Sequence, residues 1–280
     1  MCSSVGVSSL KVDANTTAVH VIKLDITKDE SVAAARKYVN DNIGSKKFWS
    51  IVNNAGIFSC YGPVDWCSPS EYQLALEVNT IGGIRVTNAF LDLLKSSRGR
   101  IVTVSSTIGL VAFPGAAPYA VSKYGVEAWM DCMRRELRPF GVTAHLLEPG
   151  GFKSTMLLDE AAMEKRMDSV WAKMTEDERA EYGEDYKKEY RRFWTELTGK
   201  HSSTRIHYVV DNYFHAITAL HPRARYLCGW DANYLWAPMA YMPTVIQDRI
   251  IDFMSKLEDN KIPVPASVQR GGKYFKEHQE

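Results

Sequence analysis

Short apolar runs and longer amphipathic stretches alternate along this chain, and this alternation strongly limits the folds that it can adopt. Three near-continuous apolar runs of strand length are FWSIVNNAG (48–56), GRIVTVSS (99–106) and GVTAHLLEPG (141–150). Such runs are typical of a parallel sheet that is covered on both faces. Helical patterns separate them, so the sequence predicts an α/β fold with a doubly wound, Rossmann-like parallel sheet.

Four further segments complete the expected order of elements. The β-branched run AVHVIKLDIT (18–27) predicts a strand, and RARYLCG (223–229) predicts the last one. SVAAARKYVNDNI (31–43) reads as a helix that Gly44 closes. Apolar residues at helical spacing predict a long half-buried helix over 72–94.

Composition indicates one ordinary globular domain rather than several. The chain has 280 residues, 45% of them hydrophobic, and we expect a single domain over 17–280 after a loose, Ser- and Thr-rich stretch at 1–16. Residues 157–200 combine dense charge with many aromatic side chains. This texture predicts amphipathic helices, which we interpret as a lid over a substrate pocket.

Charge and cysteine usage narrow the classes of partner. The net charge is +1, so nothing favours binding to nucleic acid, and a small molecule is the expected partner. Five scattered cysteines without metal-ligand spacing indicate reduced thiols in a cytoplasmic protein and no metal site. We expect no membrane span, although the apolar stretch 234–246 allows peripheral membrane contact.

The chemistry is concentrated in one segment, STIGLVAFPGAAPYAVSK (106–123). Tyr119 and Lys123 are four residues apart, so a helix places them one turn apart on one face. An ammonium beside a phenol favours the phenolate, and we expect it to lower the pKa of Tyr119 into the range of general acid–base catalysis. The Ser106 hydroxyl can hydrogen-bond the substrate oxygen with which Tyr119 would exchange its proton. The same Tyr-Lys spacing also occurs by chance in helices without any chemistry, and the surrounding motifs decide between the two interpretations.

Those motifs resemble the short-chain dehydrogenase/reductase family. Asn53-Asn54-Ala55-Gly56 follows the first run, Asn79 lies in the next helix, and Pro149-Gly150 ends the strand after the Tyr-Lys segment, so the likeness covers about Asp25 to Ser154. Two further strings, EPGGF (148–152) and HAITALHPRARYLCGWDANYLWAPMAYMP (215–243), are similar to retinol dehydrogenases and 3α- and 17β-hydroxysteroid dehydrogenases.

The resemblance implies an oxidoreductase that moves a hydride between a nicotinamide cofactor and an apolar alcohol or ketone. In this family Tyr119 would be the general acid/base, Lys123 would hold the nicotinamide ribose, and Ser106 would bind the substrate oxygen. Asn79 would order a relay water, or else it ties up backbone groups. NAD is the expected cofactor, with NADP left open. The implied cofactor contacts are Asp25, Asn53, Ala55, Gly56, Tyr119, Lys123, Pro149, Gly150, Phe152 and Ser154.

One family motif has no counterpart in this chain. Members of the family begin with a glycine-rich phosphate loop, whereas the only glycines before Asn54 are Gly6 and Gly44. We therefore expect the first two strands of the family's sheet, and any N-terminal anchor to the endoplasmic reticulum, to be missing. The missing loop leaves open a truncated, inactive form of such an enzyme. A second alternative is a 3-hydroxybutyrate dehydrogenase, because those enzymes share much of the layout of motifs. Family members also dimerise through the helices expected at 72–94 and 121–137, so a homodimer is a further expectation.

Overall fold

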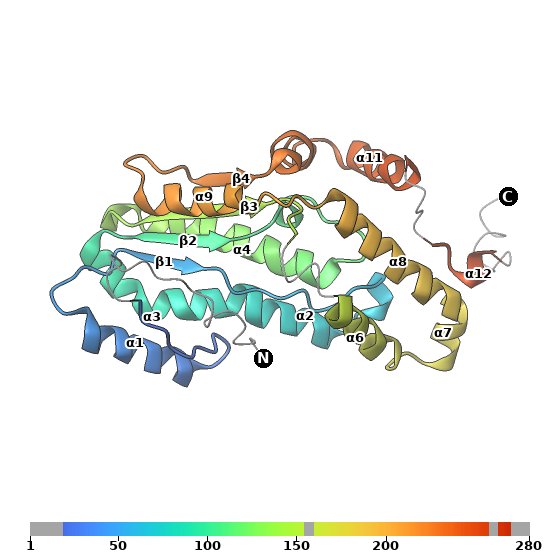
Figure 1. Cartoon of the computed structure of the whole chain (residues 1–280), viewed down its shortest axis with the longest axis horizontal. Coiled ribbons are helices and arrows are strands. Elements are labelled where there is room, and N and C mark those ends of the chain that lie inside the picture. The colour runs from blue at the N-terminus through green and yellow to red at the C-terminus, as the bar shows by residue number, and fades with distance from the viewer. Residues whose placement is uncertain (1–18, 154–159, 258–262, 270–280) are drawn as a thin grey trace.

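Four parallel strands and the helices around them form the body of the protein (Figure 1). A computed structural model describes residues 19–153, 160–257 and 263–269. The strand order is β1-β2-β3-β4, and each neighbouring pair is parallel, with Ile51 beside Ile101 and Ile101 beside Ala144. The strands are β1 (Ser50–Asn53), β2 (Arg100–Val104), β3 (Thr143–Pro149) and β4 (Arg225–Cys228). The four runs at 48–56, 99–106, 141–150 and 223–229 are thus confirmed as strands.

Helices cover both faces of this sheet, as the near-continuous apolar runs predict. Ile101 and Leu146 pack into a core with residues of three helices, whereas their neighbours Val102 and Leu147 pack with a fourth helix on the other face. This alternation follows from the two-residue period of a strand. The α-helices of the sheet region are α1 (Asp29–Ile43), α2 (Pro69–Leu76), α3 (Gly82–Ser97), α4 (Ala117–Glu136) and α9 (His207–Thr218), with α3 and α4 on the first face and α9 on the second.

The long helix expected at 72–94 contains a wider turn. Helix α2 runs through a π-helical turn, η3 (Glu77–Ile81), directly into α3. π turns are rare and often mark functional positions. Asn79 lies at the centre of this one and is 5% exposed, so the turn decides where its side chain points.

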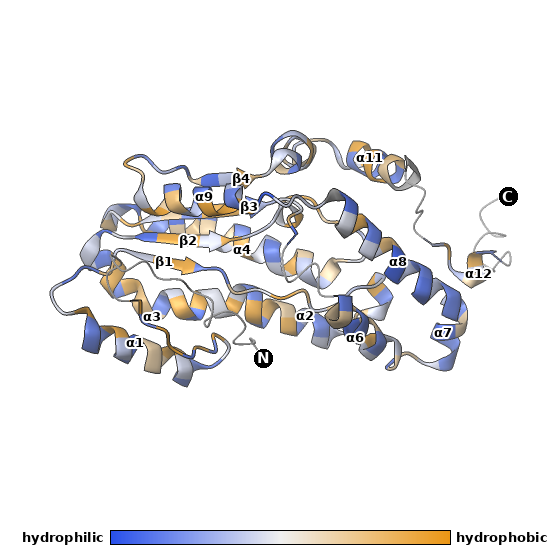
Figure 2. Ribbon diagram, viewed as in Figure 1, coloured by the Kyte–Doolittle hydropathy of each residue, from blue (hydrophilic) through white to orange (hydrophobic). Residues whose placement is uncertain are grey.

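A group of three helices covers one end of the molecule. The helices α6 (Glu160–Trp171), α7 (Glu176–Tyr182) and α8 (Glu184–His201) lie at the end toward which the arrowheads of β1 and β2 point in Figure 1. Figure 2 shows α7 mostly hydrophilic, whereas much of β2 is hydrophobic. The prediction of amphipathic helices is confirmed for α6 and α8, which each bury apolar side chains, whereas α7 buries none. The chain continues through α10 (Ala237–Ala240), α11 (Thr244–Leu257) and α12 (Ala266–Gln269).

The strand predicted at 18–27 is wrong for the described residues. Residues 19–25 form no strand, and Val19 and Val21 are 51% and 56% exposed. A strand needs a hydrogen-bonded neighbour, and in the part of the chain that the structure describes no strand pairs with this segment. It is held instead by Arg85, which donates a hydrogen bond to the Ile26 carbonyl oxygen at 2.7 Å. Residues 1–16, expected to be loose, lie outside the described residues.

Within the described residues, no helix is both long and apolar enough to cross a lipid bilayer.

Candidate active site

The first two turns of α4 hold Tyr119 and Lys123, which lie one helical turn apart. Pro118 occupies the beginning of the helix, where its missing N–H costs no hydrogen bond. Both side chains are buried, with 6% of Tyr119 and 4% of Lys123 exposed. The Lys123 Nζ lies 5.5 Å from the centre of the Tyr119 ring. The pair expected from the spacing is therefore brought together.

Ser106 joins this pair from the end of β2. It begins a short 3-10 turn, η4 (Thr107–Gly109), where its Oγ accepts a hydrogen bond from the Ile108 N–H at 3.2 Å. The Ser106 hydroxyl also lies close enough to the Tyr119 phenol to lower its pKa. The structure thus assembles Ser106, Tyr119 and Lys123 at the carboxyl end of the central strand β2.

Burial controls the protonation of both ionisable members. It raises the pKa of Tyr119 to about 12, against a smaller lowering by the hydrogen bond with Ser106. It lowers the pKa of Lys123 to about 8, against an attraction from Glu127. The expected lowering of the Tyr119 pKa by Lys123 is wrong here, because desolvation of the phenolate outweighs other influences and the Lys123 Nζ donates to the Val104 carbonyl oxygen at 2.9 Å.

Asn79 connects the loop after β1 to α4. Its Oδ1 accepts from the Ile57 N–H at 2.7 Å, and its Nδ2 donates to the Ile57 carbonyl oxygen at 3.0 Å and to the Ser122 Oγ at 2.9 Å. These contacts match the alternative in which Asn79 ties up backbone groups. A Cβ added to Gly56 would lie 3.4 Å from the Asn79 Oδ1 and 3.8 Å from the Lys123 Nζ. The loop backbone therefore passes close to the lysine.

Aromatic side chains cover Tyr119. Phe58 stacks on the Tyr119 ring with 4.7 Å between ring centres, and Trp194 of α8 meets Phe58 edge-on at 5.9 Å. This apolar cluster extends into α6 and α8 through buried Met, Trp and Tyr side chains, namely Met163, Met167, Trp171, Tyr186 and Tyr190. Any substrate that reaches Tyr119 from this side meets an apolar environment.

The sequence is similar to those of several known enzymes. The sequence model for the short chain dehydrogenase family matches residues 7–165. The chain is 42% identical over 257 residues to a 3beta-hydroxysteroid dehydrogenase of Caenorhabditis elegans, covering 91% of this chain and 66% of that protein. Retinol dehydrogenase 7 of Rattus norvegicus is 39% identical over 233 residues, covering 83% of this chain and 73% of that protein.

The chain belongs to the short chain dehydrogenase family. A third relative, 17-beta-hydroxysteroid dehydrogenase type 6 of Homo sapiens, is 40% identical over 83% of this chain and 73% of that protein. Among solved structures, a short chain dehydrogenase of Burkholderia cenocepacia shares the fold at a TM-score of 0.59 and 21% identity, over 82% of this chain and 77% of that chain. The α/β fold with a parallel sheet is thus confirmed.

Asn53, Asn54 and Ala55 lie at the carboxyl end of β1, whereas Asp25 lies in a segment that forms no strand. The Asn53 Nδ2 donates to Thr87 at 2.9 Å and to Thr103 at 3.2 Å, so it fixes β1 to α3 and β2. Asn54 and Ala55 are exposed. The Asp25 carboxylate is exposed and accepts from the Thr27 N–H and hydroxyl, and these hydrogen bonds lower the pKa of Asp25.

The segment after β3 is fixed by its backbone. The Gly150 N–H donates to the Cys228 carbonyl oxygen at 2.9 Å, and the Gly151 N–H donates to the Asp231 Oδ2 at 2.8 Å. The Phe152 ring is 6% exposed and packs in the core with Val102 and Tyr226. Only the backbone of Phe152 is therefore placed to meet a cofactor. Ser154 lies outside the described residues.

We expect Gly150→Ala to destabilise the protein by about 1–3 kcal/mol. A Cβ there would lie 2.1 Å from the Asp231 Oδ2, so the carboxylate would have to move and lose its hydrogen bond with Gly151. Urea unfolding measures the change. Gly199→Ala in α8 is the control: a Cβ there meets nothing within 4 Å, and it should gain up to about 1 kcal/mol from helix propensity. Equal effects of the two substitutions would refute the close approach.

The sequence did not predict a cluster of charged side chains around Arg225. Arg225 of β4 forms ion pairs with Glu127 and Asp131 of α4 and with Glu148 of β3. Glu148 is 1% exposed. Glu127 stands four residues after Lys123, a spacing that places both on one helix face and was available as a signal. Nothing in the sequence paired these carboxylates with Arg225.

Glu148 makes stability depend on pH. Burial, with repulsion from Glu127, raises the pKa of Glu148 from 4.5 to about 7, although Arg225 acts the other way. The folded chain then binds more protons than the unfolded chain between these values, so the free energy of unfolding falls as pH rises from 4.5 to 7. Urea unfolding across this range should show that fall in the wild type and a weaker one in Glu148→Gln. A parallel pH dependence in both would contradict this assignment.

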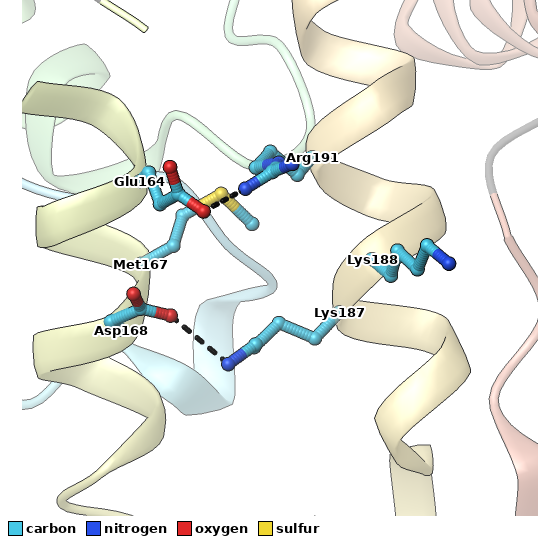
Figure 3. A pocket seen from close by; sticks show the side chains of 6 residues that line it. All are labelled: Glu164, Met167, Asp168, Lys187, Lys188 and Arg191. Atoms are coloured by element: carbon cyan, nitrogen blue, oxygen red, sulfur yellow. Dashed lines mark hydrogen bonds and ion pairs between the residues drawn. The ribbon is translucent and has the colours of Figure 1, made fainter. Parts of the chain in front are cut away.

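One cavity lies apart from the expected site residues. A cavity of about 380 Å³ lies between α6 and α8, lined by Glu164, Met167, Asp168, Lys187, Lys188 and Arg191 (Figure 3). Ion pairs Arg191–Glu164 and Lys187–Asp168 cross it, and none of the expected site residues lines it. Among the described residues, no cluster of three or more His, Cys, Asp or Glu side chains could hold a metal ion.

Proposed function

We propose that this chain is an oxidoreductase that transfers a hydride between a nicotinamide dinucleotide and an apolar alcohol or its carbonyl product, with a retinoid or hydroxysteroid as substrate. The observation that carries the proposal is the group of half-buried Ser106 with buried Tyr119 and Lys123 beneath an aromatic cover. The retinol and hydroxysteroid dehydrogenases at about 40% identity support the substrate class.

The residues fit the nicotinamide end of such a cofactor. Among the described residues, the Lys123 Nζ donates one hydrogen bond, to the Val104 carbonyl oxygen. Because an ammonium has three N–H groups, its other N–H groups are available to donate to ribose hydroxyls. Gly56 gives the loop backbone access to this point, and the backbones of Pro149 and Gly150 lie at the end of the neighbouring strand β3. A bound nicotinamide supplies the hydride acceptor in alcohol oxidation and the hydride donor in carbonyl reduction.

The chain's own residues handle the oxygen of the substrate and its proton. Tyr119, a neutral phenol near pH 7 because burial raises its pKa to about 12, donates its proton to the oxygen as a carbonyl is reduced. In alcohol oxidation the tyrosinate removes the hydroxyl proton, so that direction gains rate as pH rises. Ser106 donates a hydrogen bond to the same oxygen. Phe58 and Trp194 exclude water from the reacting centre.

Cofactor binding and substrate choice test the proposal separately. Calorimetric titration with NAD and NADP measures binding to the purified chain. Turnover of retinol, an androgen diol and 3-hydroxybutyrate then separates the substrate classes, because a small polar acid gains nothing from an aromatic cover. We expect dinucleotide binding and turnover of retinol or the diol. No binding at millimolar dinucleotide would refute the proposal and favour a catalytically inactive protein.

Self-association, membrane contact and the cytoplasmic location stay predictions. Apolar side chains are exposed on adjoining α2, η3 and α4, namely Leu74, Ile81, Val121 and Tyr124, and support a homodimer through these helices. Exposed Tyr241, Val245 and Phe253 support peripheral contact with lipid. Light scattering and vesicle sedimentation measure the two properties. A monomer at micromolar concentration, or a chain that stays in the supernatant, would refute the respective prediction.

A further inference from the structure

Two buried thiols face each other in the loop between β1 and α2. The Sγ atoms of Cys60 and Cys67 are 2.7 Å apart, and 0% of Cys60 and 8% of Cys67 are exposed. Both are free thiols. A disulfide bond is about 2.05 Å long, so bond formation needs only a small movement of the two sulfur atoms. Neither thiol takes part in the chemistry proposed for Tyr119.

The loop that carries the two thiols is held in place from both sides. Arg166 of α6 donates a hydrogen bond to the Phe58 carbonyl oxygen. The Tyr182 hydroxyl donates to the Asp65 carboxylate at 2.6 Å. On the inner side, the Gly62 N–H donates to the Gly115 carbonyl oxygen at 3.3 Å. These contacts fix the loop at Phe58, Gly62 and Asp65, close to both cysteines, so the two sulfur atoms meet without further ordering of the chain.

The aromatic neighbours add to this constraint. Trp66, next to Cys67, packs edge-on against Trp171 at 5.1 Å and against Tyr182 at 5.2 Å. Phe58, two residues before Cys60, stacks on Tyr119. A bond between the two cysteines would therefore join the part of the loop that contacts Tyr119 to the part that contacts α6 and α7.

We propose that Cys60 and Cys67 form a dithiol site that low-molecular-weight disulfides, such as glutathione disulfide, oxidise reversibly to an intramolecular disulfide. One cysteine thiolate attacks the reagent, forms a mixed disulfide and expels one thiolate. The second cysteine, as its thiolate, then attacks the protein sulfur of that mixed disulfide and expels the second thiolate. The protein loses two protons and two electrons, and the reagent becomes two thiols.

The surroundings make this reaction slow but its product favourable. The neighbouring Cys67 thiol and burial raise the pKa of Cys60, so little thiolate forms while α6–α8 cover the loop. Exchange then requires these helices to lift away. At equilibrium, however, the folded loop presents the second thiol at a high effective concentration, which favours the disulfide.

Equilibration in glutathione redox buffers tests the site without any substitution. The folded chain and the chain unfolded in urea are equilibrated at a series of glutathione to glutathione disulfide ratios, trapped by alkylation and mapped by peptide mass spectrometry. We expect the Cys60–Cys67 disulfide to dominate in the folded chain and to persist under conditions at least about tenfold more reducing than in urea. Starting from reduced unfolded chain refolded in the same buffers removes the kinetic effect of burial.

Matched variants identify the partners. Cys132→Ser changes an exposed cysteine and should leave the midpoint unchanged. Cys67→Ser should leave Cys60 reduced or joined to glutathione. Equal midpoints for folded and unfolded chain, alkylation of both thiols at every ratio, or a preferred bond from Cys60 to another cysteine would each overturn the proposal.

Discussion

Tyr119→Phe should lower kcat/KM for an apolar alcohol about 10³-fold, which lies within the range attributed to a positioned general acid/base. The substitution removes only the hydroxyl, whose pKa the neighbouring Ser106 lowers. The ring stays stacked on Phe58 with 4.7 Å between centres, so the free energy of unfolding should change by less than about 1.5 kcal/mol. Initial rates and urea unfolding on the same preparation separate the two effects.

Tyr124→Phe provides the matched control for that experiment. Tyr124 lies on the same helix, is 44% exposed, and donates its hydroxyl to the Leu110 carbonyl oxygen at 2.7 Å. It contacts none of the groups at Ser106, so its loss should leave kcat/KM within about twofold and cost about 1 kcal/mol or less. Similar rates for both variants would remove Tyr119 from the chemistry and leave it a packing residue.

Arg225→Met should cost about 3 kcal/mol of folding free energy, since it removes the cation from a buried ion pair. Glu148, which is 1% exposed, and Glu127 would face each other without it. The figure stands at the lower end of the range for buried pairs because the Arg225 side chain is 36% exposed and water screens part of the loss. Urea unfolding at pH 8, above the pKa of Glu148, gives the largest effect.

The same substitution at an exposed ion pair gives the comparison. The side chains of Arg191 and Glu164 are 46% and 51% exposed, so Arg191→Met should cost about 1 kcal/mol or less. Adding Glu148→Gln to Arg225→Met should restore part of the stability, because the uncompensated carboxylate is then gone. An Arg225→Met variant as stable as Arg191→Met would show that the cluster contributes little.

Local patterns in the sequence predicted most of the fold. The apolar runs gave four strands because a strand buried on both faces needs apolar residues at every position, as at Ile101 and Val102. The end of α1 followed from Gly44, whose φ of 57° suits glycine. The run at 18–27 failed because strand propensity cannot report whether a neighbouring strand exists. Val19 and Val21 therefore look like core residues in the sequence and are exposed in the structure.

Some features of the candidate site could likewise be predicted from the sequence, and others could not. The spacing of Tyr119 and Lys123 within one helix was readable, as was the hydroxyl of Ser106 at the end of a strand. The protonation states of Tyr119 and Lys123 could not be predicted from the sequence. Their pKa values depend on burial by residues distant in the sequence, including Phe58. The thiol pair was equally hidden: Cys60 and Cys67 are seven residues apart, and only the folded loop brings their sulfur atoms into contact.

The π turn at Glu77–Ile81 is a position where deletion of a single residue would change how the structure is connected. Such a turn amounts to one residue inserted into an α-helix, so deletion of a residue there would give a regular helix running from α2 into α3. Each residue turns an α-helix by about 100°, and the deletion would swing Asn79 away from Ile57 and Ser122, its partners at 2.7 and 2.9 Å. A one-residue deletion that suits the helix thus disconnects the loop after β1 from α4, and natural length variation should avoid this turn.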